Sequence, residues 1–300
     1  MNFSQSKTDA FKKYEFKRLC HILGFNQKLV SSVLDSIDAN YKEWSEKKID
    51  KKTGKVKKYK DGTEKIRVFR DPSKLLKGIQ SKIKDNILSP IKLPNTVHGG
   101  VKKRSNITNA KPHQGNKYIF TTDLQEFYPN ITHKRVYDTF LSLDFSTHSS
   151  HWLTKLTTWK YELPQGTPTS THLANLVFLE TDLDLINLCN QHNITYTRYV
   201  DDLTFSSQQD FRHLLNDILK IVTSHDFKLS YRKTKYSGNQ TITGINVFLN
   251  KIDAPAKVIE KSKIEIVTNA DIKPYTNYLN NIRKTNVRKK ARHQHALAAR

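Results

Sequence analysis

The chain of 300 residues has little cysteine and no long apolar run, and each shortage excludes a class of protein. Its two cysteines, Cys20 and Cys189, lie far apart and outside any Cys-x-x-Cys pair, so we expect neither a disulfide framework nor a cysteine zinc site. No apolar stretch approaches the ~18 residues of a membrane helix, and the first residues lack the apolar segment of a signal peptide. These absences predict a protein of the reducing cytoplasm that does not contact a membrane.

Acidic residues are scarce relative to basic ones, and they are unevenly distributed. The 51 Lys and Arg against 28 Asp and Glu leave a net charge of +23, which indicates a nucleic-acid partner. Residues 118–206 nevertheless hold twice as many acidic as basic residues, between strongly basic flanks. A basic protein of the ribosomal kind needs no such acidic segment. A phosphoryl-transfer enzyme does, because it uses carboxylates for metal ions and cations for a polyanion.

Hydrophobic periodicity in the first third predicts both helix and strand. Apolar residues at three- and four-residue spacing predict an amphipathic helix over 29–44. Residues 65–70 alternate as a strand does. Asp71 as N-cap and Pro72 as first helical residue would then begin a second helix, whose apolar residues lie between 75 and 87.

Later segments predict a sheet with helices on one face. Two runs rich in β-formers, 194–199 and 203–207, flank Val200-Asp201-Asp202 and predict a hairpin with acids at its turn. Another strand, 118–122, runs into Asp123. Helices are expected from about residue 134, over 173–186 and 211–222, and from 274. This order predicts an α+β fold built on an antiparallel sheet.

Three aspartates at strand ends are the candidate catalytic groups. Asp123 ends one strand, and Asp201 and Asp202 occupy the hairpin turn. Taken singly, acids at such places are usually solvated or capping groups. Together at neighbouring strand ends they would suit Mg²⁺, which bridges carboxylates to substrate phosphates. Two such ions can stabilise both oxygens of an in-line displacement.

At these aspartates the sequence resembles the reverse transcriptases. Tyr199-Val200-Asp201-Asp202 resembles their YxDD box, and residues 121–131 resemble the motif that holds the first metal-binding aspartate. The stretch LPQGTPTS (163–170) resembles the PQG loop, and residues 65–80 resemble a fingers segment of the bacterial enzymes. These four motifs stand in the family's order between about residues 64 and 250. The resemblance implies a right-hand polymerase with fingers, palm and thumb.

The same resemblance implies a division of the chain. Residues 1–117 would form a basic N-terminal helical region and fingers, and 118–250 the palm, with part of the fingers interleaved around 134–165. Residues 251–300 would form a short basic helical thumb, with no room for an RNase H, endonuclease or integrase domain.

Two further elements resemble the retron type of the family. Asn109-Ala110-Lys111-Pro112-His113 resembles its NAxxH element, and Ile242-Thr243-Gly244 stands where retron enzymes carry VTG. The resemblance implies RNA-directed DNA synthesis on a structured non-coding RNA, in bacterial anti-phage defence, with an effector protein as a further partner. One departure is Ser170-Thr171, where the family usually has Ser-Pro. Other defence-associated or group II intron-like reverse transcriptases therefore stay open as alternatives, as does a non-catalytic RNA-binding scaffold with the same fold.

The resemblance also implies roles for single residues. Asp123, Asp201 and Asp202, with the Leu124 carbonyl, would hold two Mg²⁺ ions, for which Mn²⁺ could substitute. Tyr128 would be the steric gate that excludes a 2′-hydroxyl and so selects deoxynucleotides; a core tyrosine is the plain alternative. Around the nucleotide, Gln165 would contact the sugar and base, Arg67 and Lys65 the triphosphate, and Lys233 would protonate pyrophosphate.

Basic segments outside the acidic island are expected to bind the RNA template and primer and the DNA product. The candidate contacts are Lys102, Lys103, Arg104, Asn109 and His113. A structural role for His113 is the alternative. The lysine-rich stretch 47–60 is predicted to be an exposed ribbon, either a solvated face or an RNA contact. No His-Glu-x-x-His or similar spacing occurs among the twelve histidines, so we expect no zinc site.

Overall fold

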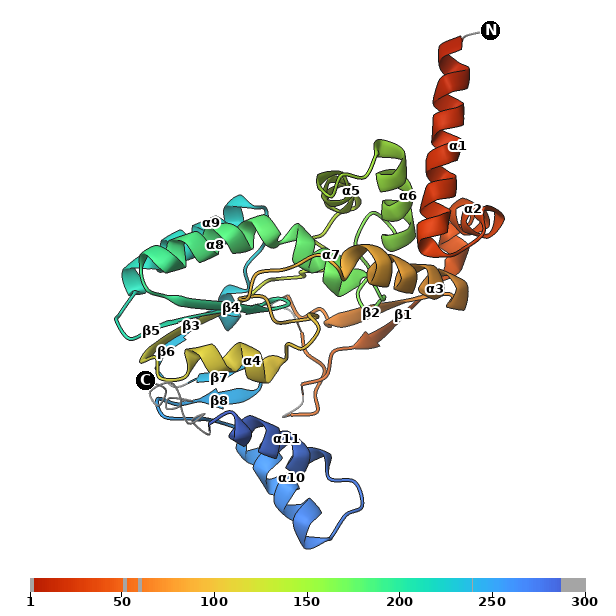
Figure 1. Cartoon of the computed structure of the whole chain (residues 1–300). Coiled ribbons are helices and arrows are strands. Elements are labelled where there is room, and N and C mark those ends of the chain that lie inside the picture. Colours follow the sequence, from red (N-terminus) through yellow and green to blue (C-terminus); the bar gives the residue numbers. More distant parts are fainter. Residues whose placement is uncertain (1–2, 51–52, 59–60, 239, 287–300) are drawn as a thin grey trace, which may run out of the picture. The chain divides into compact units, whose positions relative to one another are not determined.

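The computed structural model describes residues 3–50, 53–58, 61–238 and 240–286 (Figure 1). Contacts divide the chain into two compact units. The first unit comprises Met1–Asn95, Leu124–Asp184 and Lys220–Leu229, and the second comprises Thr96–Asp123, Leu185–Leu219 and Ser230–Arg300. The chain therefore passes repeatedly from one unit to the other. The division into fingers, palm and thumb at residues 117 and 250 stays a prediction, because these units do not follow it.

Helices dominate the first unit. They are α1 (Phe3–Leu23), α2 (Gln27–Asp35), α3 (Lys74–Ile83), the π-helical turn η2 (Lys84–Leu88), α5 (His133–Ser142), α6 (Thr147–Thr157) and α7 (Ser170–Val177). Figure 1 shows α2, α3 and α6 grouped around the C-terminal end of α1. Leu19 and Leu23 are buried there, together with Leu76 of α3 and Leu153 of α6. No helix of the described residues has both the length and the apolar character of a membrane span.

The helix expected over 29–44 is wrong in its second half. α2 ends at Asp35, a 3₁₀ turn η1 (Ile37–Asn40) follows, and Tyr41–Lys47 form strand β1. β1 pairs antiparallel with β2 (Ile66–Pro72), and Trp44 stacks on Phe69 with ring centroids 4.1 Å apart. Cross-strand pairing of aromatic side chains thus outweighs a chance helical spacing of apolar residues.

The expected N-cap of the next helix is also wrong. Strand β2 continues through Asp71 and Pro72, and the Asp71 carboxylate accepts a hydrogen bond from Trp44 Nε1 at 3.0 Å. Ser73 caps α3 instead, because its hydroxyl accepts from the backbone N–H of Leu76. Leu75 consequently faces outward with 37% of its surface exposed, while Leu76 lies in the core.

An antiparallel sheet organises the second unit. It contains β3 (Tyr118–Asp123), β4 (Thr195–Tyr199), β5 (Asp202–Ser207) and β6 (Lys235–Ser237), in the order β4-β5-β3-β6. The predicted strand at 118–122 and the predicted hairpin are confirmed. One face of the sheet carries aromatic rings in register, since Phe205 lies between Phe120 and Tyr196. α8 (Leu179–Gln191) and α9 (Leu215–Ser224) belong partly to each unit.

The other face of this sheet is lined with hydroxyl groups and is covered by two short elements. These are α4 (Asn106–Ala110) and the 3₁₀ turn η3 (Lys111–His113). The buried imidazole of His113 bonds through Nδ1 to Ser206 Oγ at 2.6 Å and through Nε2 to Thr197 Oγ1 at 2.7 Å. A buried polar network of this kind fixes the orientation of η3, because each unpaired group would carry a desolvation cost.

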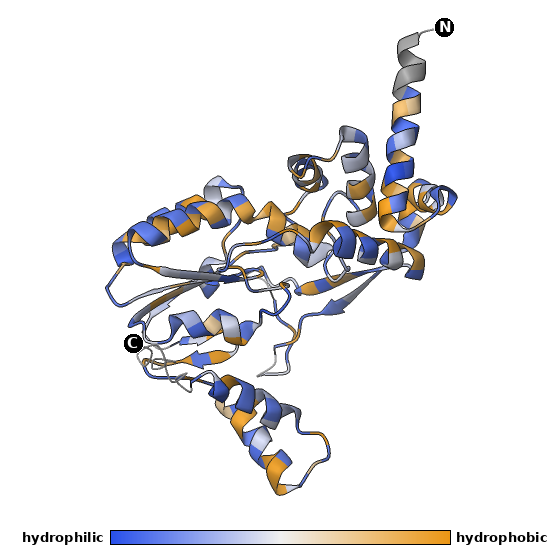
Figure 2. Cartoon of the chain, in the orientation of Figure 1, coloured by the Kyte–Doolittle hydropathy of each residue, from blue (hydrophilic) through white to orange (hydrophobic). Residues whose placement is uncertain are grey.

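A second small sheet and a helical hairpin complete the second unit. The sheet has the order β7-β8-β9, formed by Gln240–Ile242, Ile245–Val247 and Ile252–Asp253. α10 (Ala256–Val267) and α11 (Pro274–Lys284) follow, and each has both hydrophilic and apolar residues on its surface (Figure 2). The predicted helix from 274 is confirmed as far as 284; its continuation beyond 286 lies outside the described residues.

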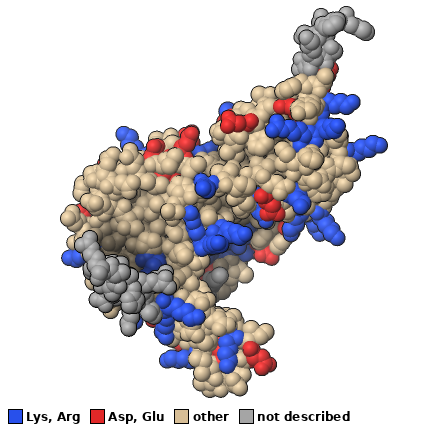
Figure 3. All heavy atoms as spheres, viewed as in Figure 1, with Lys and Arg blue, Asp and Glu red and all other residues tan. Residues whose placement is uncertain are grey.

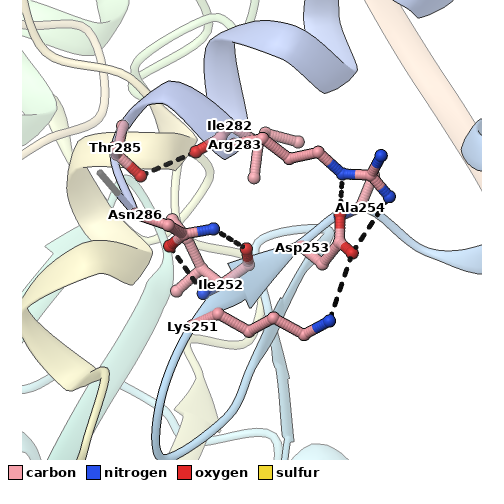
Figure 4. A network of polar contacts seen from close by, with 8 residues as sticks. All are labelled: Lys251, Ile252, Asp253, Ala254, Ile282, Arg283, Thr285 and Asn286. Atoms are coloured by element: carbon pink, nitrogen blue, oxygen red, sulfur yellow. Dashed lines mark hydrogen bonds and ion pairs between the residues drawn. The ribbon is translucent and has the colours of Figure 1, made fainter.

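Polar contacts fasten α11 to β9 (Figure 4). The Asn286 side chain accepts from the N–H of Ile252 at 3.0 Å and donates to the carbonyl of Ile252 at 2.7 Å. Arg283 adds a two-pronged ion pair with Asp253, at 3.1 and 3.2 Å. Beneath these contacts, Leu279 and Ile282 pack into an apolar core shared with β7 and β8.

We expect Asn286→Ala to loosen α11 from β9. The change leaves two backbone groups of Ile252 without their partner, which costs ~1–3 kcal/mol. Hydrogen exchange in α11 should therefore accelerate about tenfold or more, as measured by mass spectrometry. Asn281→Ala is the matched control, since Asn281 is an exposed asparagine within α11, whereas Asn286 follows the end of that helix. Equal exchange in the two variants would show that the Asn286 amide contributes nothing to docking.

Candidate active site

Strand register brings the three predicted aspartates together. β3 ends at Asp123 and β5 begins at Asp202, and these two residues are direct partners across the antiparallel pair. Asp201 lies in the two-residue turn that joins β4 to β5. Asp123 is buried, and Asp201 and Asp202 are half-buried. The expectation that strand ends would collect these carboxylates is therefore confirmed.

Burial and mutual repulsion make ionisation of Asp201 and Asp202 costly. Desolvation, and secondly the charge of Asp123, raise the pKa of Asp201. Desolvation is again the larger cause at Asp202, where repulsion from Asp201 and Asp123 adds to it and the pKa reaches about 7. Like charges close together in a poorly solvated place favour proton uptake or a bound cation. A bound cation would therefore stabilise this group of carboxylates.

One cation of the protein already reaches the site. Lys233, in the 3₁₀ turn η5 (Tyr231–Lys233), donates from Nζ to Asp123 Oδ1 at 2.7 Å. The turn is held in place by Ser230, whose N–H donates to the Asp123 carbonyl at 2.7 Å, and by Thr234, whose hydroxyl pairs with that of Thr122 at 2.9 Å. The structure thus places Lys233 beside Asp123, and its expected role at pyrophosphate stays a prediction. Its side chain is 60% exposed, so the ion pair stabilises the fold only weakly.

The donor set fits a hard divalent cation that shares its ligands with a substrate. Among the described residues no group of three or more His, Cys, Asp or Glu side chains converges to hold a metal unaided. Mg²⁺ does not require such a group, because it keeps several waters and usually takes one or two carboxylates plus substrate phosphates. Asp201 and Asp202, whose pKa values are raised, are carboxylates that could serve as such ligands. The Leu124 carbonyl directly follows Asp123 in sequence.

The residues expected around the nucleotide belong mainly to the first unit. Tyr128 is half-buried, and its hydroxyl lies 3.1 Å from Thr171 Oγ1. This contact was missed from the sequence, although the departure from Ser-Pro at Ser170-Thr171 was a signal, since proline has no hydroxyl. Gln165 is exposed in its loop, which is closed by the Ser170 hydroxyl donating to the Pro164 carbonyl at 2.5 Å.

The two residues expected at the triphosphate, Arg67 and Lys65, lie on strand β2 and directly before it. Arg67 is exposed on β2, with its guanidinium carbon 6.0 Å from the centre of the Phe69 ring, and Lys65 directly precedes this strand. Their roles at a triphosphate, like those of Tyr128 and Gln165, stay predictions.

The structure corrects two of the expected RNA contacts. Asn109 and His113 have no exposed surface. Asn109 donates to Thr243 Oγ1 at 3.3 Å, and burial, with a smaller effect of His98, lowers the pKa of His113 to about 3. Both residues of the NAxxH element therefore bind the protein's own interior. Lys102 and Lys103 are exposed, and the half-buried Arg104 donates to the Val97 carbonyl.

We expect Asp202→Asn to stabilise the metal-free protein at high pH. The raised pKa means that the folded chain binds more protons than the unfolded chain between about pH 4 and 7, so wild-type stability falls as pH rises through this window. The Asp202→Asn variant has no carboxyl group at this position, so its stability does not fall with pH for this reason. In EDTA its unfolding temperature should exceed that of wild type by about 2 °C or more at pH 8, with a smaller difference at pH 5.

Asp271→Asn is the control for this thermal measurement, since Asp271 is an exposed aspartate of the same unit. If the difference in unfolding temperature between Asp202→Asn and wild type does not grow with pH, then ionisation of Asp202 does not destabilise the folded protein.

Comparison with known proteins agrees with the geometry. A family model for reverse transcriptase (RNA-dependent DNA polymerase) matches residues 49–248. The Retron Se72 reverse transcriptase of Salmonella heidelberg (strain 579083-10) is 32% identical over 221 residues, which are 72% of this chain and 55% of that protein. The Retron Ec86 reverse transcriptase of Escherichia coli is 34% identical over 199 residues, which are 64% of this chain and 62% of that protein.

The chain thus spans 55% and 62% of the length of these two relatives. Among solved structures, telomerase from Candida albicans, in complex with a TWJ fragment of telomeric RNA, aligns with 86% of this chain and 58% of its own, at 11% identity and a TM-score of 0.47. The family match confirms the α+β, right-hand polymerase fold expected from the motifs. The chain belongs to the reverse transcriptase (RNA-dependent DNA polymerase) family, and its named relatives are of the retron type.

Proposed function

We propose that the protein is an RNA-directed DNA polymerase of the retron type, which copies a structured non-coding RNA into DNA. The observation that carries the proposal is the register of β3 against β5, which sets Asp123 opposite Asp202 with Asp201 in the adjoining turn. A non-catalytic scaffold has no use for half-buried carboxylates with raised pKa values, because they destabilise the fold. The presence of Lys233 beside them further favours an enzyme.

Asp123, Asp201 and Asp202, with the Leu124 carbonyl, are the residues that would hold two Mg²⁺ ions, or Mn²⁺ in their place. Such ions supply charge neutralisation at the phosphate and activation of the attacking hydroxyl. The carboxylates would bind and orient the ions, and the crowding that raises the pKa values of Asp201 and Asp202 would be relieved by a bound cation. Lys233 Nζ lies 2.7 Å from Asp123 Oδ1, and it is the proposed proton donor to departing pyrophosphate.

The proposed partner is an RNA that serves as template and primer. Figure 3 shows many Lys and Arg side chains standing out on the drawn face, with fewer acidic ones among them. Exposed candidates are Lys102 and Lys103 and the described part of the ribbon at 47–58; residues 51–52 and 59–60 lie outside the description. Charge alone binds any RNA, so recognition of one RNA requires its folded shape and unpaired bases. The effector protein and the role in anti-phage defence stay predictions.

We expect Asp201→Asn to abolish DNA synthesis while leaving RNA binding intact. The substitution keeps the shape of the side chain but removes the charge, so primer extension on an RNA template should fall by about 10³-fold or more. RNA affinity should remain at the wild-type value, because it rests on basic residues elsewhere. Asp271→Asn, at an exposed position, should change neither quantity. Near-normal extension by a folded Asp201→Asn variant would contradict the catalytic assignment.

The proposed steric gate gives a second expectation. Tyr128→Ala removes the ring that would lie against the sugar, so ribonucleotide incorporation relative to deoxynucleotide should rise about tenfold or more. Tyr128→Phe and Thr171→Val each delete one side of the hydroxyl pair at 3.1 Å and should produce the same smaller rise. The double variant should add nothing further, since both changes remove one interaction. Unchanged selectivity in single-nucleotide kinetics would make Tyr128 a core residue.

A further inference from the structure

Val200, in the turn between the catalytic strands, has an unfavourable backbone conformation. Its φ is +60°, in the left-handed region. A β-branched side chain is rarely found there, because its methyl groups crowd the backbone. Val200 directly precedes Asp201 and Asp202, so its φ sets the direction in which the chain enters β5. Strain at such a place persists only where the surroundings enforce it.

The segment formed by residues 96–99 runs alongside this turn. Residues 96–98 pair in parallel with the end of β4, since Arg198 N–H donates to the Thr96 carbonyl and His98 N–H to the Arg198 carbonyl, each at 2.8 Å. The guanidinium of Arg104 donates to the carbonyl of Val97 between them. Two backbone hydrogen bonds thus fasten this segment beside the YxDD box, and a third, from Arg104, holds its middle residue.

Gly99 then makes the close approach. A Cβ at this position would lie 2.5 Å from both the backbone nitrogen and Cγ2 of Val200, and 3.0 Å from the carbonyl carbon of Tyr199. The two distances of 2.5 Å are shorter than real Cβ contacts, the third is tight, and two of the three atoms belong to the backbone. Only glycine lets the segment touch the turn without displacing it. By contrast, a Cβ at Gly78 in α3 would meet only the tip of the Phe25 ring at 3.7 Å.

Arg198 holds the turn from its other side. Its side chain has no exposed surface, which is rare for arginine, and Nη1 donates to the Val200 carbonyl at 2.9 Å. A buried guanidinium is retained at high desolvation cost, so its hydrogen bonds must be geometrically well defined. Both peptide groups of Val200 are therefore restrained: its nitrogen lies where a Cβ at position 99 would collide with it, and its carbonyl accepts a hydrogen bond from Arg198.

We propose that Gly99 and Arg198 form a clamp that keeps Val200 left-handed and thereby aims Asp201 and Asp202 toward Asp123. Both are positioning residues: Gly99 acts on the carboxylates through the backbone of the turn, and Arg198 acts through the same backbone and also through its charge, which favours the ionised form of Asp201. The proposal rests on the proposed function for its catalytic consequence, but the clamp itself is a property of the fold. Without the clamp, the φ of Val200 would change toward the negative values that valine ordinarily adopts, and Asp201 and Asp202 would move with it.

The test compares Gly99→Ala and Arg198→Met with Gly78→Ala, a control glycine with room for a methyl group. Two measurements do not depend on turnover: hydrogen exchange of the peptide 195–207, and Mn²⁺ affinity followed by electron paramagnetic resonance. In both clamp variants the amide hydrogens of this hairpin should exchange faster, and Mn²⁺ should bind at least about tenfold more weakly. Their kcat should fall about 10²-fold, as expected for a displacement near 1 Å. The control should match wild type in all three.

Substitution of Val200 separates a clamp from a general loss of packing. Glycine at position 200 adopts a positive φ without help, so Val200→Gly should restore most of the Mn²⁺ affinity lost in Arg198→Met. Rescue of Gly99→Ala should be partial, because the collision with the backbone nitrogen remains. Equal losses with valine and with glycine at position 200 would overturn the proposal. So would wild-type exchange and Mn²⁺ affinity in a folded Gly99→Ala or Arg198→Met variant.

These outcomes are independent of those for Asp201→Asn. If that variant kept full activity, the proposed function would fail, while hairpin exchange would still report on the clamp. If Asp201→Asn were inactive and the clamp variants behaved as wild type, only the clamp would be rejected.

Discussion

Repulsion between three carboxylates at one end of a sheet is the constraint on which the second unit depends. Antiparallel register requires Asp123 and Asp202 to be neighbours, and the tight turn adds Asp201. Burial strengthens the repulsion, as the raised pKa values of Asp201 and Asp202 show. The arrangement survives because the sheet is rigid and because Lys233 offsets part of the charge. A substrate that brought cations would relieve the rest, so under the proposed function the repulsion that costs stability would favour ligand binding.

The rigidity has a specific source in the polar face of the sheet. One face of this sheet buries aromatic rings, whereas on the other the hydroxyls of Thr197 and Ser206 meet a fully buried histidine. Hydrogen bonds require defined distances and angles, so this face tolerates fewer alternative packings than an apolar one. The NAxxH element is therefore a structural device that supports the strands of the active site. The structural role that the sequence left open for His113 is therefore the one the fold shows.

Local patterns predicted the elements near the site better than those far from it. The hairpin and β3 were found because dense β-formers end at turn residues, a signal that needs no tertiary information. The expected helix over 29–44 failed because its spacing is also compatible with a helix followed by a strand, and pairing with β2 decided between them. Ser73 replaced Asp71 as the cap for the same reason: the strand continued two residues further than its own composition indicated.

The sequence by itself determined the chemistry: which carboxylates occur, in which motifs and in which order, and a charge of +23 suited to a polyanion. These are properties of residue type and short spacing, which the chain carries whether or not it is folded. Only the tertiary structure decided that His113 is internal, that Thr171 holds Tyr128, and that Gly99 touches Val200. These pairs lie 43 to about 100 residues apart, and no local pattern encodes contacts made when distant segments pack together.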